Sequence, residues 1–548
     1  MTHDITYTTK TKQLIDSLKS VCANYGLGND GNEFKIITQV FLYKFLNDKF
    51  RFEVKRLRPE IADNKEFYQN LKNLYDTQSD KYELLMDLLD ENVPRLKPHQ
   101  LISHLYNTQN SDDFAQTFDD TLRDIGVENA DVFSIKSFSG AKDRLFDELS
   151  NYITDSSQRD DFCKALVNKL FEFSFEESFE DYFTEKYDFF KDIFEYLIKD
   201  YNSDSGGKYA EYYTPNAVAR IIANILVEGD VKKARCYDPS VGSGSLLMSL
   251  AHNIGEDRCT IYSEDISQKS STMLRLNLIL NNLTHSIPNV IKTNTIAQPY
   301  YLEKQKFDYI VSNPPFKLDF SDFREHLDTD RFKERFFAGI PKVPKAKKES
   351  MAIYLLFIQH IMYSLSENGK AAIVVPTGFI TAQSGIEKKI RERLIDKGWL
   401  RGIVSMPSNI FASTGTNVSV IFIDKQAGRE QIVLMDASKL GETVKEGKNQ
   451  RTVLTREEEA RIVNTFHNKE VVEDLSVIVN ADEVKEKNYS FSAGQYFEVK
   501  IEYVDITPEE FSDKMNGFET RLAELFKEGN KLDVEIQKQL KGLEYERN

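Results

Sequence analysis

Two kinds of hydrophobic pattern divide the chain. Over roughly the first 200 residues, apolar side chains recur at helical spacing, as at Phe34, Ile37, Phe41 and Phe45, and strand-like alternation is scarce. From about residue 206 to 425, short apolar runs typical of buried strands alternate with helical stretches. The pattern therefore predicts an all-helical N-terminal domain followed by a doubly wound, largely parallel α/β sheet.

The chain of 548 residues is too long for a single hydrophobic core, so several domains are expected. Near its end, Thr507-Pro508-Glu509-Glu510 carries helix-start signals, and apolar residues follow at helical spacing. The expected segments are a helical domain (1–170), a helical linker (171–205), a catalytic domain (206–425), its C-terminal extension (426–505) and a helical tail (506–548).

A glycine-rich turn follows the first expected strand of the sheet. The strand ends at Asp238, and glycines at positions 242 and 244 would let a ligand approach the backbone closely. Leu247 replaces the third glycine of the dinucleotide-binding pattern, and the absence of Gly-Lys-Ser/Thr excludes a P-loop. The turn therefore favours a nucleoside ligand without a pyrophosphate.

The next expected strand, 260–263, ends in two carboxylates, Glu264 and Asp265. They follow the glycines by about 20 residues, where α/β nucleotide-binding folds place the acid that binds a ribose. We expect Glu264 to bind the ribose because it is the first residue past the apolar run. Asp265 is expected to cap the helix that follows.

The apolar run 307–312 leads directly into Asn313-Pro314-Pro315-Phe316. The two prolines remove backbone donors, so the Asn313 amide and the Pro314 carbonyl are left as acceptors beside the ring of Phe316. This combination suits a planar ring with an exocyclic amino group, such as an adenine turned out of its stack. Alone, Asn-Pro-Pro is more often an ordinary turn at the end of a strand.

A helix start precedes the glycine turn. Thr214 is expected to be its N-cap, with Pro215 at the first helical position, before an apolar helical pattern. The free N–H groups of such a start could bind a ligand carboxylate.

Charge and composition narrow the class of protein further. The net charge is −16, whereas proteins that hold DNA unaided usually carry a basic surface, so either the basic residues gather on one face or a partner supplies much of the contact. The basic segment 341–348 is expected to be a solvated loop, with phosphate contact as the alternative.

The four cysteines match no zinc or disulfide pattern, and neither a membrane-length apolar run nor a signal-peptide core is present, so a cytoplasmic protein is expected.

In combination these motifs resemble a known family. Asp-Pro-x-x-Gly-x-Gly at 238–244, a strand-end Glu and then Asn-Pro-Pro-Phe is the signature of the γ-order amino-methyltransferases. The Tyr-Tyr-Thr-Pro segment at 212–215, the helical N-terminal region and the stretch 406–411 narrow the resemblance to the methylation subunit of type I restriction–modification systems, over most of the chain. The resemblance implies methyl transfer from S-adenosylmethionine to N6 of an adenine in double-stranded DNA. It also implies a separate specificity subunit, which binds the helical tail of this chain, with two copies of the chain for each specificity subunit. A restriction subunit is implied as a further partner.

The resemblance assigns roles residue by residue. Asn313 and Pro314 would pull the adenine amino hydrogens toward a pyramidal geometry, Phe316 would stack on the flipped base, and Pro315 completes the motif. The cofactor positions carry over to Glu211, Tyr212, Tyr213, Thr214, Pro215, Asp238, Gly242, Ser243, Gly244, Ser245, Glu264 and Asn294. Three residues depart from the family pattern: Ala210 and Ser245 stand where Gly is usual, and Asn294 stands where many relatives have Asp. Asn294 is expected to accept a hydrogen bond from the cofactor's adenine through its side-chain carbonyl.

Three alternatives remain at this stage. A solitary adenine methyltransferase would need its own target-recognition region, for which the residues beyond 425 are charged and poor in aromatics. A protein-glutamine methyltransferase could also use Asn-Pro-Pro, but a large helical domain is unexpected for it. A non-catalytic nucleotide-sensing scaffold is disfavoured because the donor and acceptor motifs are both intact.

Overall fold

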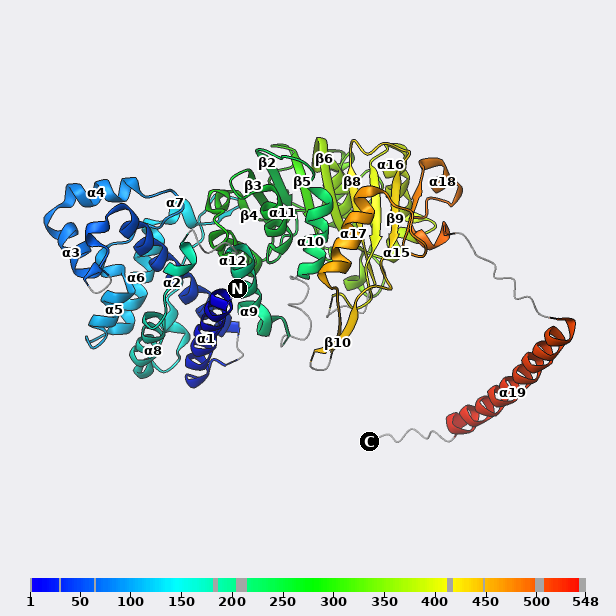
Figure 1. The fold of residues 1–548 in the computed structure, drawn as a ribbon, viewed down its shortest axis with the longest axis horizontal. Coiled ribbons are helices and arrows are strands. Elements are labelled where there is room, and N and C mark those ends of the chain that lie inside the picture. The colour runs from blue at the N-terminus through cyan, green and yellow to red at the C-terminus, as the bar shows by residue number, and fades with distance from the viewer. Residues whose placement is uncertain are drawn as a thin grey trace. The chain divides into compact units, whose positions relative to one another are not determined.

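The computed structural model describes residues 2–28, 31–63, 66–180, 186–203, 214–411, 417–446, 449–497 and 507–541. The chain divides into two compact units, Met1–Tyr496 and Phe497–Asn548, which are described separately. Figure 1 shows the order of the elements from the N-terminus to the C-terminus. The finer boundaries expected inside the first unit stay predictions.

The first part of unit 1 is helical, as expected. Its helices are α1 (Thr2–Asn24), α2 (Gly31–Leu57), α3 (Phe67–Thr77), α4 (Ser79–Leu88), α5 (Ile102–Thr108), α6 (Phe114–Glu128), α7 (Ala130–Phe133), α8 (Arg159–Phe171) and α9 (Lys186–Ser203). Most residues of α2 are buried, including an ion pair between Lys44 and Asp48 (Nζ to Oδ1, 3.0 Å). The other Asp48 oxygen accepts the Phe175 N–H at 2.7 Å, so the buried carboxylate is satisfied on both sides. This helix is the core of the domain.

One ten-stranded sheet occupies the rest of unit 1. Its strands are β1 (Lys136–Ser137), β2 (Ala234–Asp238), β3 (Cys259–Asp265), β4 (Val290–Lys292), β5 (Phe307–Ser312), β6 (Leu365–Pro376), β7 (Leu400–Ser405), β8 (Val418–Asp424), β9 (Ile432–Asp436) and β12 (Ser476–Val479). They are ordered β1-β4-β3-β2-β5-β6-β8-β7-β9-β12. Neighbouring pairs are parallel from β1 to β6, and β8 runs antiparallel to β6 and β7. The expected doubly wound, largely parallel sheet is confirmed, with the addition that the helical region contributes β1 to its edge.

The strand order places helices on both faces. Between β2 and β4 the chain moves outward in one direction through α11 (Ser245–Ile254) and α12 (Gln268–Leu280), and from β5 it moves in the other direction through α14 (Tyr354–Ser364). Because such crossovers are right-handed, the two sets cover opposite faces. The order reverses between β2 and β5, and ligands of open α/β sheets bind beside the carboxyl ends of such strands.

The remaining elements of unit 1 are α10 (Asn216–Leu226), α13 (Arg324–Leu327), α15 (Gly378–Thr381), α16 (Gly385–Asp396), α17 (Arg456–Asn468), α18 (Ala481–Glu486) and the hairpin β10 (Glu442–Glu446) and β11 (Asn449–Val453). Helix α10 packs against both α11 and α17, as Figure 1 shows. The hairpin is held by Thr452, whose N–H and hydroxyl donate to the carbonyls of Asn409 (3.1 Å) and Ser408 (2.6 Å).

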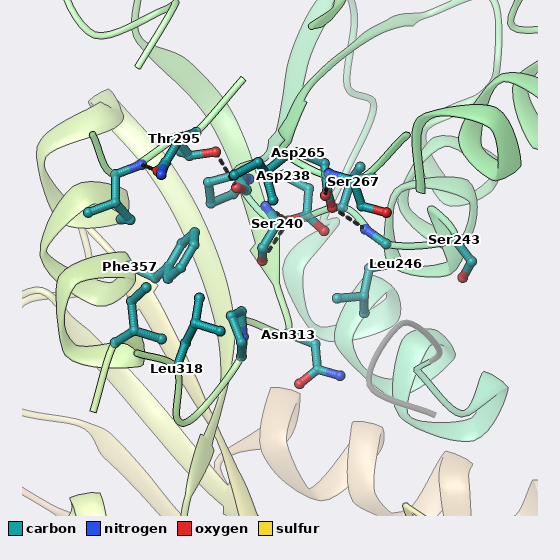
Figure 2. Close-up of a pocket in the computed structure, with 18 of the residues that line it drawn as sticks. Asp238, Ser240, Ser243, Leu246, Asp265, Ser267, Thr295, Asn313, Leu318 and Phe357 are labelled. Atoms are coloured by element: carbon teal, nitrogen blue, oxygen red, sulfur yellow. Dashed lines mark hydrogen bonds between the residues drawn. The ribbon is translucent and has the colours of Figure 1, made fainter. Parts of the chain in front are cut away.

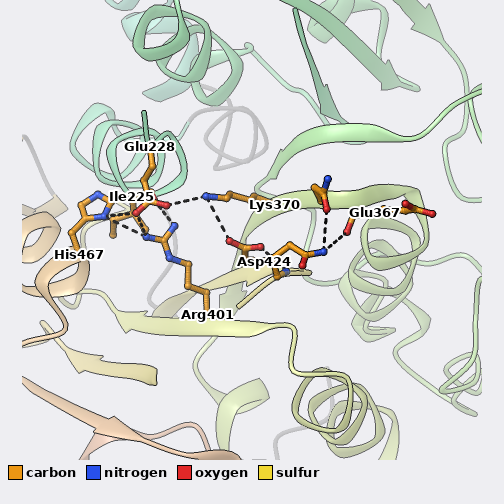
Figure 3. Close-up of polar contacts among 9 residues, drawn as sticks. Ile225, Glu228, Glu367, Lys370, Arg401, Asp424 and His467 are labelled. Atoms are coloured by element: carbon orange, nitrogen blue, oxygen red, sulfur yellow. Dashed lines mark hydrogen bonds and ion pairs between the residues drawn. The ribbon is translucent and has the colours of Figure 1, made fainter. Parts of the chain in front are cut away.

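A polar network joins the end of α10 to the sheet (Figure 3). Glu228 accepts hydrogen bonds from Lys370 Nζ (2.9 Å) and Arg401 Nη2 (2.8 Å), while His467 of α17 lies 2.9 Å from the Asn224 carbonyl. Partial burial raises the pKa of Glu228, but the Lys370 hydrogen bond and the Arg401 charge outweigh it and lower the pKa. Since Lys370 also pairs with Asp424 at 3.6 Å, the network links α10 and α17 to β6, β7 and β8.

Unit 2 contains helix α19 (Pro508–Lys541). Thr507 and Glu510 form the expected reciprocal cap: the Thr507 N–H donates to Glu510 Oε2 (2.9 Å), and the Glu510 N–H donates to Thr507 Oγ1 (3.2 Å). Its apolar stripe is exposed, as the fractional exposures show: Phe511 57%, Met515 41%, Phe518 67%, Leu522 56% and Leu525 49%. Throughout the described residues, no helix has the length and apolar character needed to span a bilayer.

Candidate active site

A cavity of about 330 Å³ lies at the carboxyl ends of β2, β3, β4 and β5. Figure 2 shows Asp238, Asp265 and Thr295 gathered on one side and Asn313 at the other end. Its lining combines the polar residues Thr214, Asp238, Ser240, Ser243, Ser245, Asp265, Ser267, Asn294, Thr295, Asn313 and Asp319 with apolar residues that include Val241, Leu246, Ile266, Ile296, Leu318, Phe323, Ile353 and Phe357. Such a mixture suits a ligand that has both charged and flat apolar parts.

The glycine turn forms one wall of the cavity, and its backbone conformation favours glycine at two positions. Gly242 and Gly244 have φ of +54° and +85°, and α11 begins at Ser245 directly after them. A Cβ on Gly244 would be strained at this φ and would lie 2.5 Å from Cδ1 of Leu274 in α12, so the leucine side chain would have to move. Gly242, Ser243 and Ser245 thus lie where the sequence predicted them, within the cavity wall.

Two carboxylates face the cavity, Asp238, which is buried, and Asp265, which is partly buried. Asp238 Oδ1 accepts the Ser240 N–H (2.8 Å), and Asp265 accepts the N–H groups of Gly242 (Oδ2, 3.1 Å) and Ser267 (Oδ1, 2.8 Å). Burial raises the pKa of Asp238 to about 8 and that of Asp265 to about 6, despite these hydrogen bonds. Two neighbouring acids favour a cationic ligand, whose charge would stabilise the ionised form of Asp238.

The structure corrects the assignment of Glu264. Glu264 is fully buried and does not line the cavity, because side chains alternate along β3 and only its neighbour Asp265 faces the ligand side. Asp265 also receives the Gly242 N–H and so ties the glycine turn to β3. Of the two acids, only Asp265 lines the cavity, so the structure favours Asp265 over Glu264, which counting from the apolar run had selected.

Glu264 instead ends a buried chain of hydrogen bonds. Arg335 Nε donates to His360 Nδ1 (3.1 Å), His360 Nε2 lies 3.0 Å from the Tyr237 hydroxyl, and that hydroxyl donates to Glu264 Oε2 (2.8 Å). Burial holds the pKa of His360 well below its ordinary value, which matches the acceptor role of Nδ1 and places the ring proton on Nε2.

Both ends of this chain of hydrogen bonds support the segment 294–301, whose first three residues line the cavity. Glu264 Oε1 accepts the N–H groups of Tyr300 and Tyr301, the latter at 3.0 Å. The Arg335 guanidinium donates to the carbonyls of Thr295 (2.7 Å) and Ile296 (2.8 Å). Glu264 therefore shapes the cavity from behind.

Asn294 lines the cavity as expected, but its side-chain oxygen is bonded to the backbone and its side-chain nitrogen is not. Its Oδ1 accepts the N–H groups of Ile296 (3.1 Å) and Ala297 (3.0 Å), which occupy both lone pairs of the oxygen. Its Nδ2 has no partner among the residues that the structure describes. The side chain thus presents a donor to the cavity, where the sequence led us to expect an acceptor.

Thr214 and Asn313 meet at the far end of the cavity. Asn313 Nδ2 donates to Thr214 Oγ1 at 3.2 Å. Thr214 is not the expected N-cap: α10 begins at Asn216, Pro215 occupies the capping position, and proline has no side-chain acceptor. The Thr214 hydroxyl is therefore available to orient the Asn313 amide, with Oδ1 as the remaining acceptor.

The other motif residues have different positions. Pro315 lines the cavity, Pro314 is buried, and Phe316 is partly buried, with its ring 6.2 Å from that of Tyr354 in an edge-on contact. Glu211, Tyr212 and Tyr213 lie outside the described residues. Sequence reasoning missed several cavity residues, among them Ile266, Phe323, Ile353 and Phe357, which carry no local motif. Of these four, only Ile266 could have been indicated, by its position beside a strand-end acid.

The sheet, the glycine turn and the strand-end acid define the class of Rossmann-like methyltransferases. More specifically, the chain belongs to the N-6 DNA Methylase family, whose sequence profile matches residues 185–503. The assignment to adenine-directed DNA methyltransferases that the motifs supported is thereby confirmed.

Individual relatives agree with this family. The chain is 27% identical over 539 residues to the type I restriction enzyme MpnII methylase subunit of Mycoplasma pneumoniae, which covers 91% of this chain and 93% of the relative. It is 25% identical over 368 residues to the HindI methylase subunit of Haemophilus influenzae, covering 65% of this chain and 78% of the relative. The fold is similar to that of a type I restriction–modification methyltransferase subunit from Streptococcus thermophilus, with a TM-score of 0.72 at 20% identity over 90% of this chain and all of the other (100%).

Proposed function

We propose that this chain is the methylation subunit of a type I restriction–modification complex. It transfers a methyl group from S-adenosylmethionine to N6 of an adenine flipped out of double-stranded DNA, and a separate specificity subunit selects the site. The observation that carries the proposal is the Asn313 amide, held by Thr214 at the end of a cavity built for a nucleoside.

The cavity suits S-adenosylmethionine in three respects. Asp238 and Asp265 supply negative charge for a cationic ligand, and Asp265 can accept hydrogen bonds from the two ribose hydroxyls. The exposed side chain of Ile266 and the ring of Phe357 provide apolar surface for the adenine, and Asn294 Nδ2 can donate to a ring nitrogen. When bound, the cofactor supplies a methyl group activated by its attachment to a sulfonium.

The chain's own residues then prepare the acceptor. An adenine amino group is a poor nucleophile because its lone pair is delocalised into the ring. Asn313 Oδ1 and the Pro314 carbonyl can each accept one amino hydrogen, which favours a pyramidal nitrogen and directs the lone pair toward the methyl group. Since Nδ2 of Asn313 is already bound to Thr214, the amide need not reorient when the base arrives.

The partner assignment rests on helix α19. Five apolar residues form an exposed stripe along a capped helix, and such a face is suited to pack into a helical bundle with another chain. We assign this face to the specificity subunit, with two copies of the present chain for each such subunit.

Methyl transfer with labelled S-adenosylmethionine, followed by mass spectrometry of the DNA digest, tests this function. The reaction should yield N6-methyladenine when the partner subunit is present. Asn313→Ala should abolish transfer yet keep cofactor affinity within about threefold. The control is Asn253→Ala, which removes an exposed amide at the C-terminal end of α11 and should change neither transfer nor affinity. Loss of cofactor binding in Asn313→Ala, or a product other than N6-methyladenine, would contradict the proposal.

A further inference from the structure

A group of lysines lies in the segment 342–348, which follows the catalytic motif in sequence and leads to Met351, the hydrogen-bond partner of the cavity residue Leu318. Lys342, Lys345, Lys347 and Lys348 are exposed, with Glu349 as the single carboxylate between residues 341 and 350. Lys317, directly after Phe316, is exposed as well. None of these five lysines forms an ion pair with any residue in the described ranges. In a chain with a net charge of −16, such an excess of unpaired positive charge is a local exception.

The segment is anchored by hydrogen bonds at both ends, and its C-terminal anchor is the cavity residue Leu318. At its start, the Pro341 carbonyl accepts a hydrogen bond from Arg324 Nε (3.3 Å), and the Gly339 carbonyl accepts one from Gln359 Nε2 of α14 (3.0 Å). At its end, the Leu318 N–H donates to the Met351 carbonyl at 3.0 Å. Leu318 is two residues beyond Phe316 and lines the same cavity as Asn313 (Figure 2). The lysines therefore lie in a segment whose end is held beside the catalytic motif.

The backbone of the segment is also restrained. Pro341 and Pro344 fix two φ angles, and Lys347 adopts a left-handed φ of +58° within a turn closed by the Ser350 N–H and the Lys347 carbonyl at 2.9 Å. The positive charge of Lys348 also influences Asp319, which lines the cavity. Hydrogen bonds from Ser321 lower the pKa of Asp319, and the charge of Lys348 lowers it further. The stretch from Lys342 to Lys348 can reach at most about 20 Å. That length is enough to follow several phosphates of one strand, which are spaced about 3.4 Å apart along the duplex axis.

We propose that Lys342, Lys345, Lys347 and Lys348, with Lys317, form a phosphate-binding rim that holds the DNA strand carrying the target adenine. This inference rests on the proposed function, because it assigns the rim to the strand whose base enters the cavity. The rim contacts phosphates and so adds affinity without reading sequence. A flipped base requires its flanking phosphates to be held close to Asn313, and the rim lies where those phosphates would pass.

The test uses the full chain loaded with S-adenosylmethionine and a fluorescently labelled duplex of mixed sequence. Affinity is measured by anisotropy over a series of salt concentrations. Replacing Lys342, Lys345, Lys347 and Lys348 together by Ala should weaken binding at low salt at least about tenfold. It should also flatten the plot of log affinity against log salt by about 0.9 for each phosphate that is no longer neutralised. Replacing the same four by Arg keeps the charge and should preserve most of the affinity and slope.

The matched control is the pair Lys232→Ala and Lys397→Ala, two exposed lysines that precede the amino ends of β2 and β7, whereas the cavity lies at the carboxyl ends of the strands. This pair should leave affinity and slope unchanged. The rim is refuted if the Ala variant binds like the unaltered chain, if the control pair weakens binding equally, or if the unaltered chain fails to bind the duplex at low salt. A rim that passes this test in a chain that transfers no methyl group would separate the two ideas, since the rim would stand and the proposed activity would fail.

Discussion

The side-chain amide of Asn313 donates a hydrogen bond to the hydroxyl of Thr214 at 3.2 Å, although 99 residues separate the two in the sequence. The bond fixes which end of the amide faces the acceptor base. An unrestrained amide could turn by half a rotation and present a donor to an amino group that needs an acceptor.

Thr214→Val should therefore lower kcat for methyl transfer, because valine keeps the shape of threonine and removes the hydrogen-bond acceptor. A net hydrogen bond contributes about 0.5–1.5 kcal/mol, so a loss of roughly two- to tenfold is expected. Thr214→Ser should restore the rate. Single-turnover kinetics at saturating cofactor measures the change, and a Ser variant as slow as the Val variant would contradict the orienting role.

Asp265 and Glu264 should respond differently to loss of charge. Asp265→Asn should weaken S-adenosylmethionine binding by about 1.5–3 kcal/mol, the contribution of a hydrogen bond to a charged group. Glu264→Gln should mainly lower the melting temperature, because it disturbs the buried contacts with Tyr237, Tyr300 and Tyr301. Calorimetric titration and thermal unfolding of both variants distinguish the roles. Weaker cofactor binding in Glu264→Gln alone would show that Glu264, and not Asp265, binds the ribose.

Binding of S-adenosylmethionine should release protons near neutral pH. The pKa of Asp238 is raised to about 8, so the carboxyl is largely protonated at pH 7, and a cationic ligand favours its ionised form. We expect about one proton released per cofactor at pH 7 and an affinity that rises as the pH approaches 8. Titration calorimetry in buffers of different ionisation enthalpy measures the release. Asp238→Asn should abolish it, and a buffer-independent enthalpy for the unaltered chain would refute the linkage.

The stability of the unliganded chain should also depend on pH, through the carboxyl group of Asp238. Because the folded protein raises the pKa of Asp238 above its ordinary value, it binds the proton more tightly than the unfolded chain does. This contribution is fully present below about pH 4 and is lost as the pH rises toward 8. Asp238→Asn should remove it, so the difference in melting temperature between the variant and the unaltered chain should depend on pH across this range. A constant difference would contradict the raised pKa.

Deleting residues 507–548 should abolish co-purification with the specificity subunit and leave cofactor affinity unchanged, because the exposed stripe of α19 is removed while the cavity in unit 1 remains. A finer test replaces Phe518 and Leu522 of the stripe with Glu, and Lys527→Glu provides a control on the same helix. A truncated chain that still assembles and methylates a specific site would show that the partner binds elsewhere.

The pattern of apolar residues was sufficient to predict the fold because strands and helices have different periods. The helical N-terminal region, the alternation of strands and helices after it and the glycine turn all follow from local sequence. The pairing of Lys136–Ser137 with β4 could not be predicted, since two residues carry no periodicity and their partners are more than 150 positions away.

The cavity was predicted less completely than the fold. Motifs identify residues that the backbone places by itself, such as Gly242, Gly244 and Asn313. The choice between Glu264 and Asp265 depends on the face to which each side chain points, and a shift of one residue reverses that face. The amide of Asn294 depends on two neighbouring N–H groups, and the partner of Thr214 is distant in sequence. Such features are decided by tertiary geometry.

The buried chain from Arg335 through His360 and Tyr237 to Glu264 has a consequence for how related sequences can diverge. Its hydrogen bonds all run in one direction, from Arg335 toward Glu264, so replacing a single member leaves a buried neighbour without its hydrogen-bond partner. Drift through single substitutions is therefore obstructed at all four positions. They should be inherited as a block, changing together or not at all, even though none of them touches the ligand.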